Sequence, residues 1–179
     1  MTAVTRAGVR GGIARWLGGT YTAAERCYQG GPLQAYGLAT VRSFFAKRVS
    51  DQEYTAGLAP GRSMGAVAVV HLGDSTERRI AVGGATDGWK HRFYAVTLHL
   101  YHLAQVPQAE DAQADLDELL EAIATLVHAD RTLGGTVTQA GESTSGIRFF
   151  LGQPEYTPPP EYIRTYASVT FDADTYIQA

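Results

Sequence analysis

The stretch from Ala109 to Val137 carries the clearest periodic pattern in the chain, and it constrains the fold because its apolar side must be covered. Aliphatic residues recur there at steps of three and four, which places them on one side of a helix. They are Leu116, Leu119, Leu120, Ile123, Leu126 and Val127. Acidic residues crowd the first half, at the positive end of the helix dipole, and Gly134 and Gly135 follow the last turn. We therefore expect one long amphipathic helix that lies on a sheet or on another helix.

The overall composition is that of an ordinary soluble globular protein. With 179 residues, of which 45% are hydrophobic and 18% charged, the chain fits one domain with a substantial core. A net charge of −3 argues against a protein that mainly coats nucleic acid, since that role needs a basic surface. Cys27 is the only cysteine, so no intrachain disulfide can form and a reducing cytosol is expected. The sequence shows no signal-peptide pattern and no apolar run near the roughly 20 residues that cross a bilayer, so we expect no membrane partner.

The middle of the chain shows strand patterns. Residues 65–72 form a nearly continuous apolar run and residues 77–83 alternate, so the segment 73–76 between them predicts a hairpin turn. Residues 91–103 also alternate. The residues of this segment expected to face the core are Tyr94, Val96, Leu98 and Leu100.

Two more strands are expected after the long helix, in residues 146–151 and 162–171. A proline cluster at 158–160 separates them, because proline cannot sit inside a sheet. Residues 172–179 are expected to form a short acidic tail. In the second strand, one face carries Ile163, Thr165, Ala167, Val169 and Phe171.

The N-terminal part is less regular. Residues 1–19 predict a short helix that several glycines weaken, and we interpret it as an arm or as a helix stabilised by a partner. Residues 33–48 favour a helix that starts at Pro32, with a strand as the alternative, because the segment contains β-branched and aromatic residues. Residues 49–62 predict a surface loop.

Together these patterns predict an α+β fold. We expect a mostly antiparallel or mixed sheet of about four to five strands, with one long amphipathic helix packed on one face and an N-terminal helical arm. Residues 1–60 would form the arm, as an extension of the same domain, and residues 61–179 would form the core.

One segment matches a catalytic motif. Residues 61–65 read Gly-Arg-Ser-Met-Gly, the pattern of a nucleophile elbow with Ser63 as the nucleophile. That elbow needs a strand before the serine and a helix after it, whereas here a Pro-Gly loop precedes and an apolar strand follows. A small serine hydrolase that uses Ser63 is therefore only a distant alternative.

Metal and cofactor sites are not indicated either. His99 and His102 would point to opposite faces of a strand and cannot chelate one metal ion. The glycine-rich segment 83–88 lacks the lysine and the hydroxyl residue of a phosphate-binding loop, and a strand follows it in place of a helix. The carboxylates of Asp115, Asp117 and Glu118 fit a solvated helix face. We expect no cofactor, no metal ion and no enzymatic activity.

The order of the elements points to a family. The strand HRFYAVTLHLYHLA leads to the long helix, the helix exit reads ADRTLGGT, and the late strand reads IRTYASVTFDAD. This arrangement, over roughly residues 60–175, resembles the tail terminator (tail completion) proteins of long-tailed bacteriophages. The first 50–60 residues are longer than the family pattern needs.

The resemblance implies a virion structural protein. Its copies would form a hexameric ring that caps the tail tube, ends tail elongation and offers the surface on which the head docks. The implied partners are further copies of this chain, the major tail tube protein and the head-tail connector protein, with DNA only passing through the ring lumen. Assembly would take place in the host cytoplasm, and the protein would end at the head-tail interface of the virion. A head-to-tail connector or stopper protein is the alternative.

Four charged residues are expected near subunit contacts. Arg78, Arg79, Asp130 and Arg131 lie at predicted strand or helix ends beside loops, in a protein expected to self-assemble. Charge reversal at Arg131 would then weaken ring formation at low salt.

Overall fold

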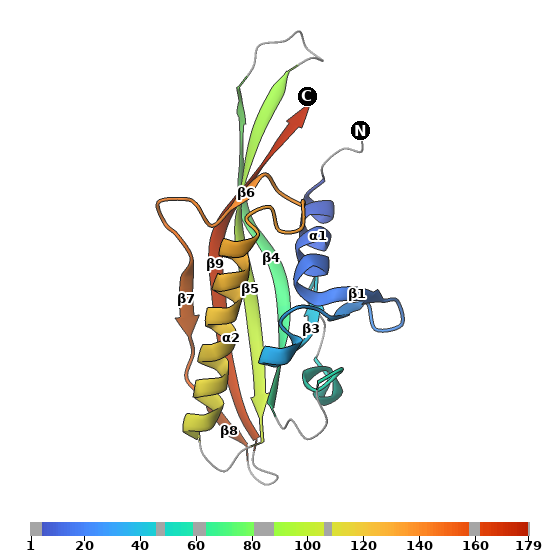
Figure 1. Ribbon diagram of the computed structural model, residues 1–179, viewed down its shortest axis with the longest axis vertical. Coiled ribbons are helices and arrows are strands. Elements are labelled where there is room, and N and C mark those ends of the chain that lie inside the picture. Colours follow the sequence, from blue (N-terminus) through green and yellow to red (C-terminus); the bar gives the residue numbers. More distant parts are fainter. Residues whose placement is uncertain are drawn as a thin grey trace.

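The computed structural model describes residues 5–45, 49–58, 64–80, 88–105, 109–157 and 162–178, and it has two α-helices on one face of a single twisted sheet (Figure 1). The helical elements are α1 (Arg6–Gly18), the 3₁₀ turns η1 (Gln34–Tyr36) and η2 (Asp51–Tyr54), and α2 (Ala109–Ala129). The strands are β1 (Gly19–Thr22), β2 (Cys27–Gly30), β3 (Leu38–Arg42), β4 (Met64–Arg79), β5 (Trp89–Ala104), β6 (Gln139–Ala140), β7 (Arg148–Leu151), β8 (Glu155–Thr157) and β9 (Tyr162–Gln178).

The sheet is larger than the sequence predicted. In the described part of the chain, nine strands form one mixed sheet in the order β1-β2-β3-β4-β5-β9-β6, and β7 and β8 also pair with β9. Only β3 and β4 run parallel among these pairs. The predicted α+β fold with four to five strands, one helix and an N-terminal arm is therefore wrong. The missed strands have two to five residues each, too few for a period of two to stand out.

The predicted hairpin at residues 73–76 is also wrong, because β4 is one continuous strand. Its pairing with β5 shifts register between Leu72 and Ser75, as at a β-bulge. A bulge bends a strand without ending it, and glycine at position 73 fits that geometry. The turn signal in the sequence therefore marks a bend within a long strand.

The predicted acidic tail is the second half of β9. Asp172 to Gln178 pair with β5 along the whole segment, so the strand does not stop at Phe171. Ala173 and Thr175 are buried and continue the alternation of Ala167, Val169 and Phe171. The carboxylates of this segment lie on a sheet face.

The predicted buried faces of β5 and α2 are confirmed. Tyr94, Val96, Leu98 and Leu100 of β5 are buried. Five of the six expected aliphatic residues of α2 are buried, and Leu126 packs partly buried against the same core. At the end of α2 the chain turns through Leu133, Gly134 and Gly135, all with positive φ.

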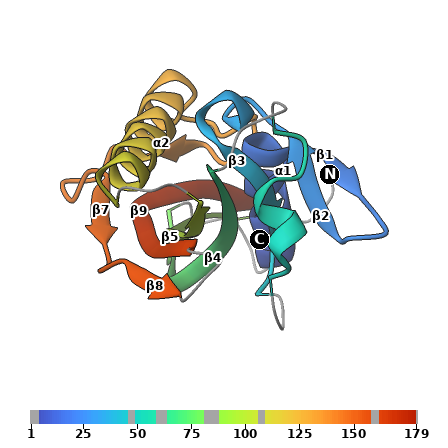
Figure 2. The ribbon, with the colours of Figure 1, turned by 90° about the horizontal axis from the view of Figure 1, so that it is seen from below.

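Helix α1 is part of the body and does not form an extended arm. Val9, Ile13 and Leu17 belong to the same apolar core as the strands β4, β5 and β9. A Cβ atom at Gly18 would lie 2.6 Å from the Cβ of Tyr28, so this glycine lets the helix approach the sheet closely. Figure 2 shows α1 over the β3 and β4 side and α2 over the β9 side of the sheet.

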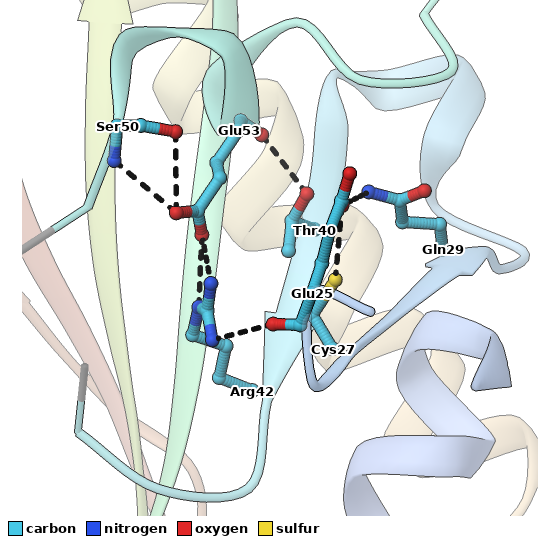
Figure 3. Close-up of polar contacts among 7 residues, drawn as sticks. All are labelled: Glu25, Cys27, Gln29, Thr40, Arg42, Ser50 and Glu53. Carbon is cyan, nitrogen blue, oxygen red and sulfur yellow. Dashed lines mark hydrogen bonds and ion pairs between the residues drawn. The ribbon is translucent and has the colours of Figure 1, made fainter. Parts of the chain in front are cut away.

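Residues 33–48 contain a 3₁₀ turn and a strand in place of the favoured helix. Every residue of β3 is buried, including Arg42. The guanidinium of Arg42 forms an ion pair with Glu53 (Figure 3). Its Nε lies 2.8 Å and its Nη2 2.7 Å from Glu53 Oε2. The third nitrogen, Nη1, donates to the Glu25 carbonyl. Because Glu53 also accepts from the Ser50 backbone N–H, this ion pair connects η2 to the sheet.

Cys27 faces the same polar cluster. Its Sγ donates to Glu25 Oε2 at 3.6 Å (Figure 3). Burial, together with the Glu25 carboxylate, raises the pKa of the Cys27 thiol to about 11. The thiol therefore stays protonated and has little nucleophilic character at neutral pH.

Neither α-helix in the described ranges is long and apolar enough to cross a bilayer.

Candidate interaction surface

Three strands extend beyond the helices and form a ribbon (Figure 1). We define the ribbon as residues 75–80 of β4 and its end, 88–94 of β5, and 173–178 of β9. Across the ribbon, Arg78 of β4 lies opposite His91 of β5, and His91 lies opposite Tyr176 of β9. The ribbon begins at the β4 register shift, where the strand bends.

One side of the ribbon is charged and paired within itself. Glu77 accepts from Lys90 at 2.8 Å and from Arg92 at 2.6 Å. These two cations lower the pKa of the Glu77 carboxyl through hydrogen bonds, and Glu77 raises the pKa of Arg92. Because these three side chains are charged and partly exposed, this side of the ribbon is a polar, solvated surface.

The other side of the ribbon is aromatic. Trp89, Phe93 and Tyr176 are 43%, 39% and 42% exposed, values that leave large apolar rings in water. His91 stacks on Tyr176 with 4.4 Å between ring centroids, and its Nε2 lies 2.7 Å from Asp174 Oδ2. Exposed aromatic groups gathered on one side of an element are typical of surfaces that contact another molecule.

The same face of the sheet carries a second aromatic group on the body, away from α1 and α2. Odd-numbered residues of β5 and even-numbered residues of β9 share this face, because opposite members of a strand pair point the same way. We call its rings the aromatic cluster: Phe45, His71, His99, Tyr101, Phe150 and Tyr166.

His99 is at the centre of the aromatic cluster. Its Nδ1 lies 2.6 Å from the Tyr166 hydroxyl, and its ring centroid lies 5.6 Å from that of His71. Burial lowers the pKa of His99, and the neighbouring His71 lowers it further. His99 is therefore neutral at pH 7, which suits an uncharged contact surface.

A shallow hollow of about 320 Å³ lies beside the aromatic cluster. Phe45, Val69 and Tyr101 form its apolar part, and Asp51 and Arg164 form its charged rim. The rim pair is solvent-exposed, with 3.7 Å between Arg164 Nη2 and Asp51 Oδ1. In the described part of the chain, no group of three or more metal-ligating side chains is found.

The structure places the four residues predicted near subunit contacts in two pairs. Arg78 and Arg79 lie on the ribbon, and the Arg78 side chain is exposed. Asp130 and Arg131 lie at the exit of α2. The two pairs approach the same end of the sheet, because the chain after the exit pairs with Asp174 through Gln139 (Figure 1).

Asp130 has a clear role within the chain. Its carboxylate accepts from the backbone N–H groups of Thr132 and Gly134, from the Thr132 hydroxyl and from Trp16 Nε1. These hydrogen bonds lower the pKa of the Asp130 carboxyl, and the bond from the Thr132 hydroxyl has the largest effect. Asp130 therefore shapes the helix exit and connects it to α1, while Arg131 makes an exposed ion pair with Glu142 at 3.0 Å.

Two predicted motifs lie partly outside the described residues. They are Ser63 with its glycine-rich motif, whose first three residues are not described, and the glycine-rich segment 83–88, of which only Gly88 is described. The expected proline connector at 158–160 also falls outside.

The ribbon and the aromatic cluster could not be identified from the sequence. The alternation of β5 placed Phe93 and His99 on the face away from the core, which is the one signal the sequence contains. Whether that face is exposed depends on which strands and helices cover it. That coverage is a property of the whole sheet.

Compared with known proteins, the chain matches no protein-family model and no curated protein.

Proposed function

We propose that this chain is a virion structural protein, a tail terminator whose copies form a hexameric ring. The ring would cap the tail tube, end its elongation and give the head a surface on which to dock. The observation that carries this proposal is the ribbon, which leaves the body with Trp89, Phe93 and Tyr176 exposed on one side. A projecting element of this kind supports contacts between chains, which is what ring assembly needs.

The arrangement of the resembling segments supports the same proposal. The strand that leads to the long helix is β5, and the late strand is β9, which pairs with β5 over its whole length. The helix exit between them closes on Asp130, next to α1. These segments therefore form one continuous unit, in agreement with the element order that suggested a tail terminator.

The test is a tube-capping experiment. Purified protein is mixed with assembled tail tubes and examined by negative-stain electron microscopy, and six-fold rings at tube ends are expected. A persistent monomer that never binds tube ends contradicts the proposal. Rings that do not bind tubes but bind the portal side of a head would instead indicate the head-to-tail connector.

Arg131 offers a charge test within that experiment. Arg131→Glu loses the exposed ion pair with Glu142, and weaker rings at low salt are expected if this residue lies at a subunit contact. Unchanged rings would remove Arg131 from the contact without affecting the proposed function.

A further inference from the structure

The strand β7 forms an edge of the sheet whose outer side has no strand partner among the described residues. β7 pairs only with β9 there, and no other described backbone group forms a hydrogen bond with it. Gly152, the next residue, donates its N–H inward to the Tyr166 carbonyl. Because successive residues of a strand direct their N–H groups to opposite edges, the backbone groups of Phe149 and Leu151 point outward. This edge can therefore accept a further strand.

The side chains of β7 are exposed, although most of them are large and apolar. Phe149, Phe150 and Leu151 are 46%, 58% and 39% exposed, and among the four residues of β7 only Arg148 is charged. Native proteins protect open edges by charge, by proline or by a covering element, because an open apolar edge pairs readily with another chain. The apolar part of β7 is therefore suited to bind an extended segment.

The two faces of this edge differ in character. Phe149 lies opposite Val169, which is buried in the core that the helices cover, so Phe149 and Leu151 belong to the α2 side of the sheet. Phe150 faces the other way, toward the aromatic cluster, with its ring centroid 6.2 Å from that of Tyr166. A strand added to β7 would continue this alternation. One set of its side chains would face the α2 side, and the other set would lie beside Phe150.

The helix α2 runs alongside β7 (Figure 1 and Figure 2). Near the start of the helix, Glu110 and Leu151 line the same hollow of about 220 Å³. Near its end, a Cβ atom added to Gly141 would lie 3.1 Å from Val127 Cγ1 and 3.6 Å from Ile147 Cγ1, so these two side chains are neighbours. The helix and the strand therefore lie side by side and run in opposite directions.

The flank of α2 next to β7 is acidic. Gln113 lines the same hollow as Leu151, and steps of three and four residues place Glu110, Asp117 and Glu121 on the same flank as Gln113. These three carboxylates are exposed, and none forms an ion pair with another described residue. Because α2 contains neither lysine nor arginine, this flank attracts cationic side chains.

This acidic flank decides which occupant suits the edge. A second copy, paired antiparallel through its own β7, would place both α2 helices on the same face of one continuous sheet. The carboxylate rows of the two helices would then face each other across the junction, and like charges in that position oppose association. A segment that carries basic residues is attracted by the same carboxylates.

We infer that β7 is a docking site for an extended segment of a partner protein in which basic and apolar residues alternate. The segment adds a strand to the sheet. Its basic side chains lie on the α2 side, near Glu110, Asp117 and Glu121, and its apolar side chains lie beside Phe150. The site goes beyond the proposed function, since it does not depend on a ring of copies.

A labelled model peptide tests the site. Fluorescence polarisation measures the binding of a fluorescein-labelled octapeptide of alternating lysine and valine to the purified protein at low salt. Saturable binding is expected. An octapeptide of alternating glutamate and valine should bind about tenfold more weakly or less, because the α2 flank repels it. Absence of binding by the lysine peptide, or equal binding of the two peptides, overturns the inference.

N-methylation of the peptide tests whether it pairs as a strand. One further peptide carries N-methyl groups on its lysines only and another on its valines only, since alternate N–H groups of a strand point to opposite sides. One of the two should bind about tenfold more weakly, because it has lost the donors that face β7, and the other should bind as before. The same effect in both peptides contradicts strand pairing.

A proline variant locates the pairing at β7. Phe149→Pro removes an outward N–H and leaves the hydrogen bonds to β9 in place, so about tenfold weaker binding of the lysine peptide is expected. Phe149→Val is the control, because it removes the same ring and keeps the N–H. Circular dichroism checks that both variants are folded. Equal affinity of the two folded variants contradicts a site on this edge.

Charge variants of α2 provide an independent measurement that leaves the strand unchanged. Asp117→Lys combined with Glu121→Lys should weaken binding of the lysine peptide about tenfold at low salt, with a smaller effect at high salt. Asp111→Lys combined with Glu118→Lys is the control, because it changes the net charge equally at exposed positions that the helical period turns away from β7. Equal weakening by the two double variants contradicts the inference.

Sedimentation velocity of the protein without peptide tests the other occupant. A dimer that Phe149→Pro dissociates and Phe149→Val does not would place a second copy on β7 and overturn the inference.

Discussion

Asp130 shows how one side chain can organise the junction between two helices. Four donors converge on its carboxylate, from Thr132, Gly134 and Trp16. The motif that follows α2 therefore has a structural explanation: the aspartate accepts the hydrogen bonds, and the glycines adopt positive φ in the turn.

Replacing Asp130 by alanine is expected to lower the free energy of unfolding by about 2–3 kcal/mol at pH 7, since several charge-assisted hydrogen bonds disappear. Asp117→Ala, on the exposed side of α2, is the control and should change it by less than about 0.5 kcal/mol. Urea denaturation measures both. Equal midpoints would show that the hydrogen bonds of Asp130 add nothing to stability.

His99 makes the stability of the body depend on pH. Its pKa is lowered by burial and by His71, so the unfolded chain binds a proton more readily than the folded chain. The contribution of His99 is complete above the ordinary histidine pKa, and stability falls as the pH drops from about 7 toward 5. His99→Phe should reduce that fall, measured by urea denaturation at several pH values. An unchanged pH profile would contradict the assignment.

At the scale of elements, the glycines of α1 have two different roles. Gly18 lies where the helix meets β2 and β3, and an added Cβ would come within 2.7 Å of the Val41 Cβ. At Gly11 an added Cβ meets only the Tyr28 hydroxyl, at 3.8 Å, an ordinary contact. The sequence shows both as weak helix formers, and only the packing distinguishes them.

Gly18→Ala is therefore expected to destabilise the protein by about 1–3 kcal/mol through overpacking. Gly11→Ala should stabilise it by about 0.5–1 kcal/mol, because alanine loses less backbone entropy in a helix. Thermal unfolding compares the two variants with the wild type. If both shift the midpoint in the same direction, the close approach of α1 to the sheet is wrong.

The ion pair of Arg42 and Glu53 holds η2 on the sheet (Figure 3). Glu53→Ala leaves the Arg42 side chain, which is 9% exposed, without its carboxylate partner, and a loss of unfolding free energy on the order of 3 kcal/mol is expected. Asp51→Ala removes a carboxylate of the same turn that is 75% exposed, and it should cost less than about 1 kcal/mol. If urea denaturation gives the two variants a similar loss of unfolding free energy, the buried ion pair stabilises the protein no more than an exposed carboxylate does.

The elements α2 and β5 could be predicted from the sequence, whereas the short strands β1, β2 and β3 and the full extent of β4 and β9 could not. α2 and β5 repeat their pattern over 21 and 16 residues, so the period is unambiguous. β1, β2 and β3 have four or five residues, and all five residues of β3 are buried, which removes the alternation. The segment 73–76 predicts a turn because a glycine is typical of a bulge and of a turn alike. The ribbon depends on where neighbouring strands end, which no local pattern records.

At the scale of the whole molecule, the chain divides into a covered body and a ribbon that the helices do not cover. In the body, Leu98 and Leu100 of β5 are buried under α2 and α1, whereas in the ribbon Trp89 and Phe93 remain exposed. Local opening costs least where few apolar contacts hold the backbone. The two halves of β5 should therefore open with different free energies.

Amide hydrogen exchange of the dilute protein should show fast exchange in residues 89–93 and slow exchange in residues 96–102 of the same strand. The difference should be about tenfold or more, since only the second half is covered on its apolar face. Mass spectrometry of peptic peptides measures the exchange of both segments. Uniform protection along β5 in the dilute protein would contradict the division into body and ribbon.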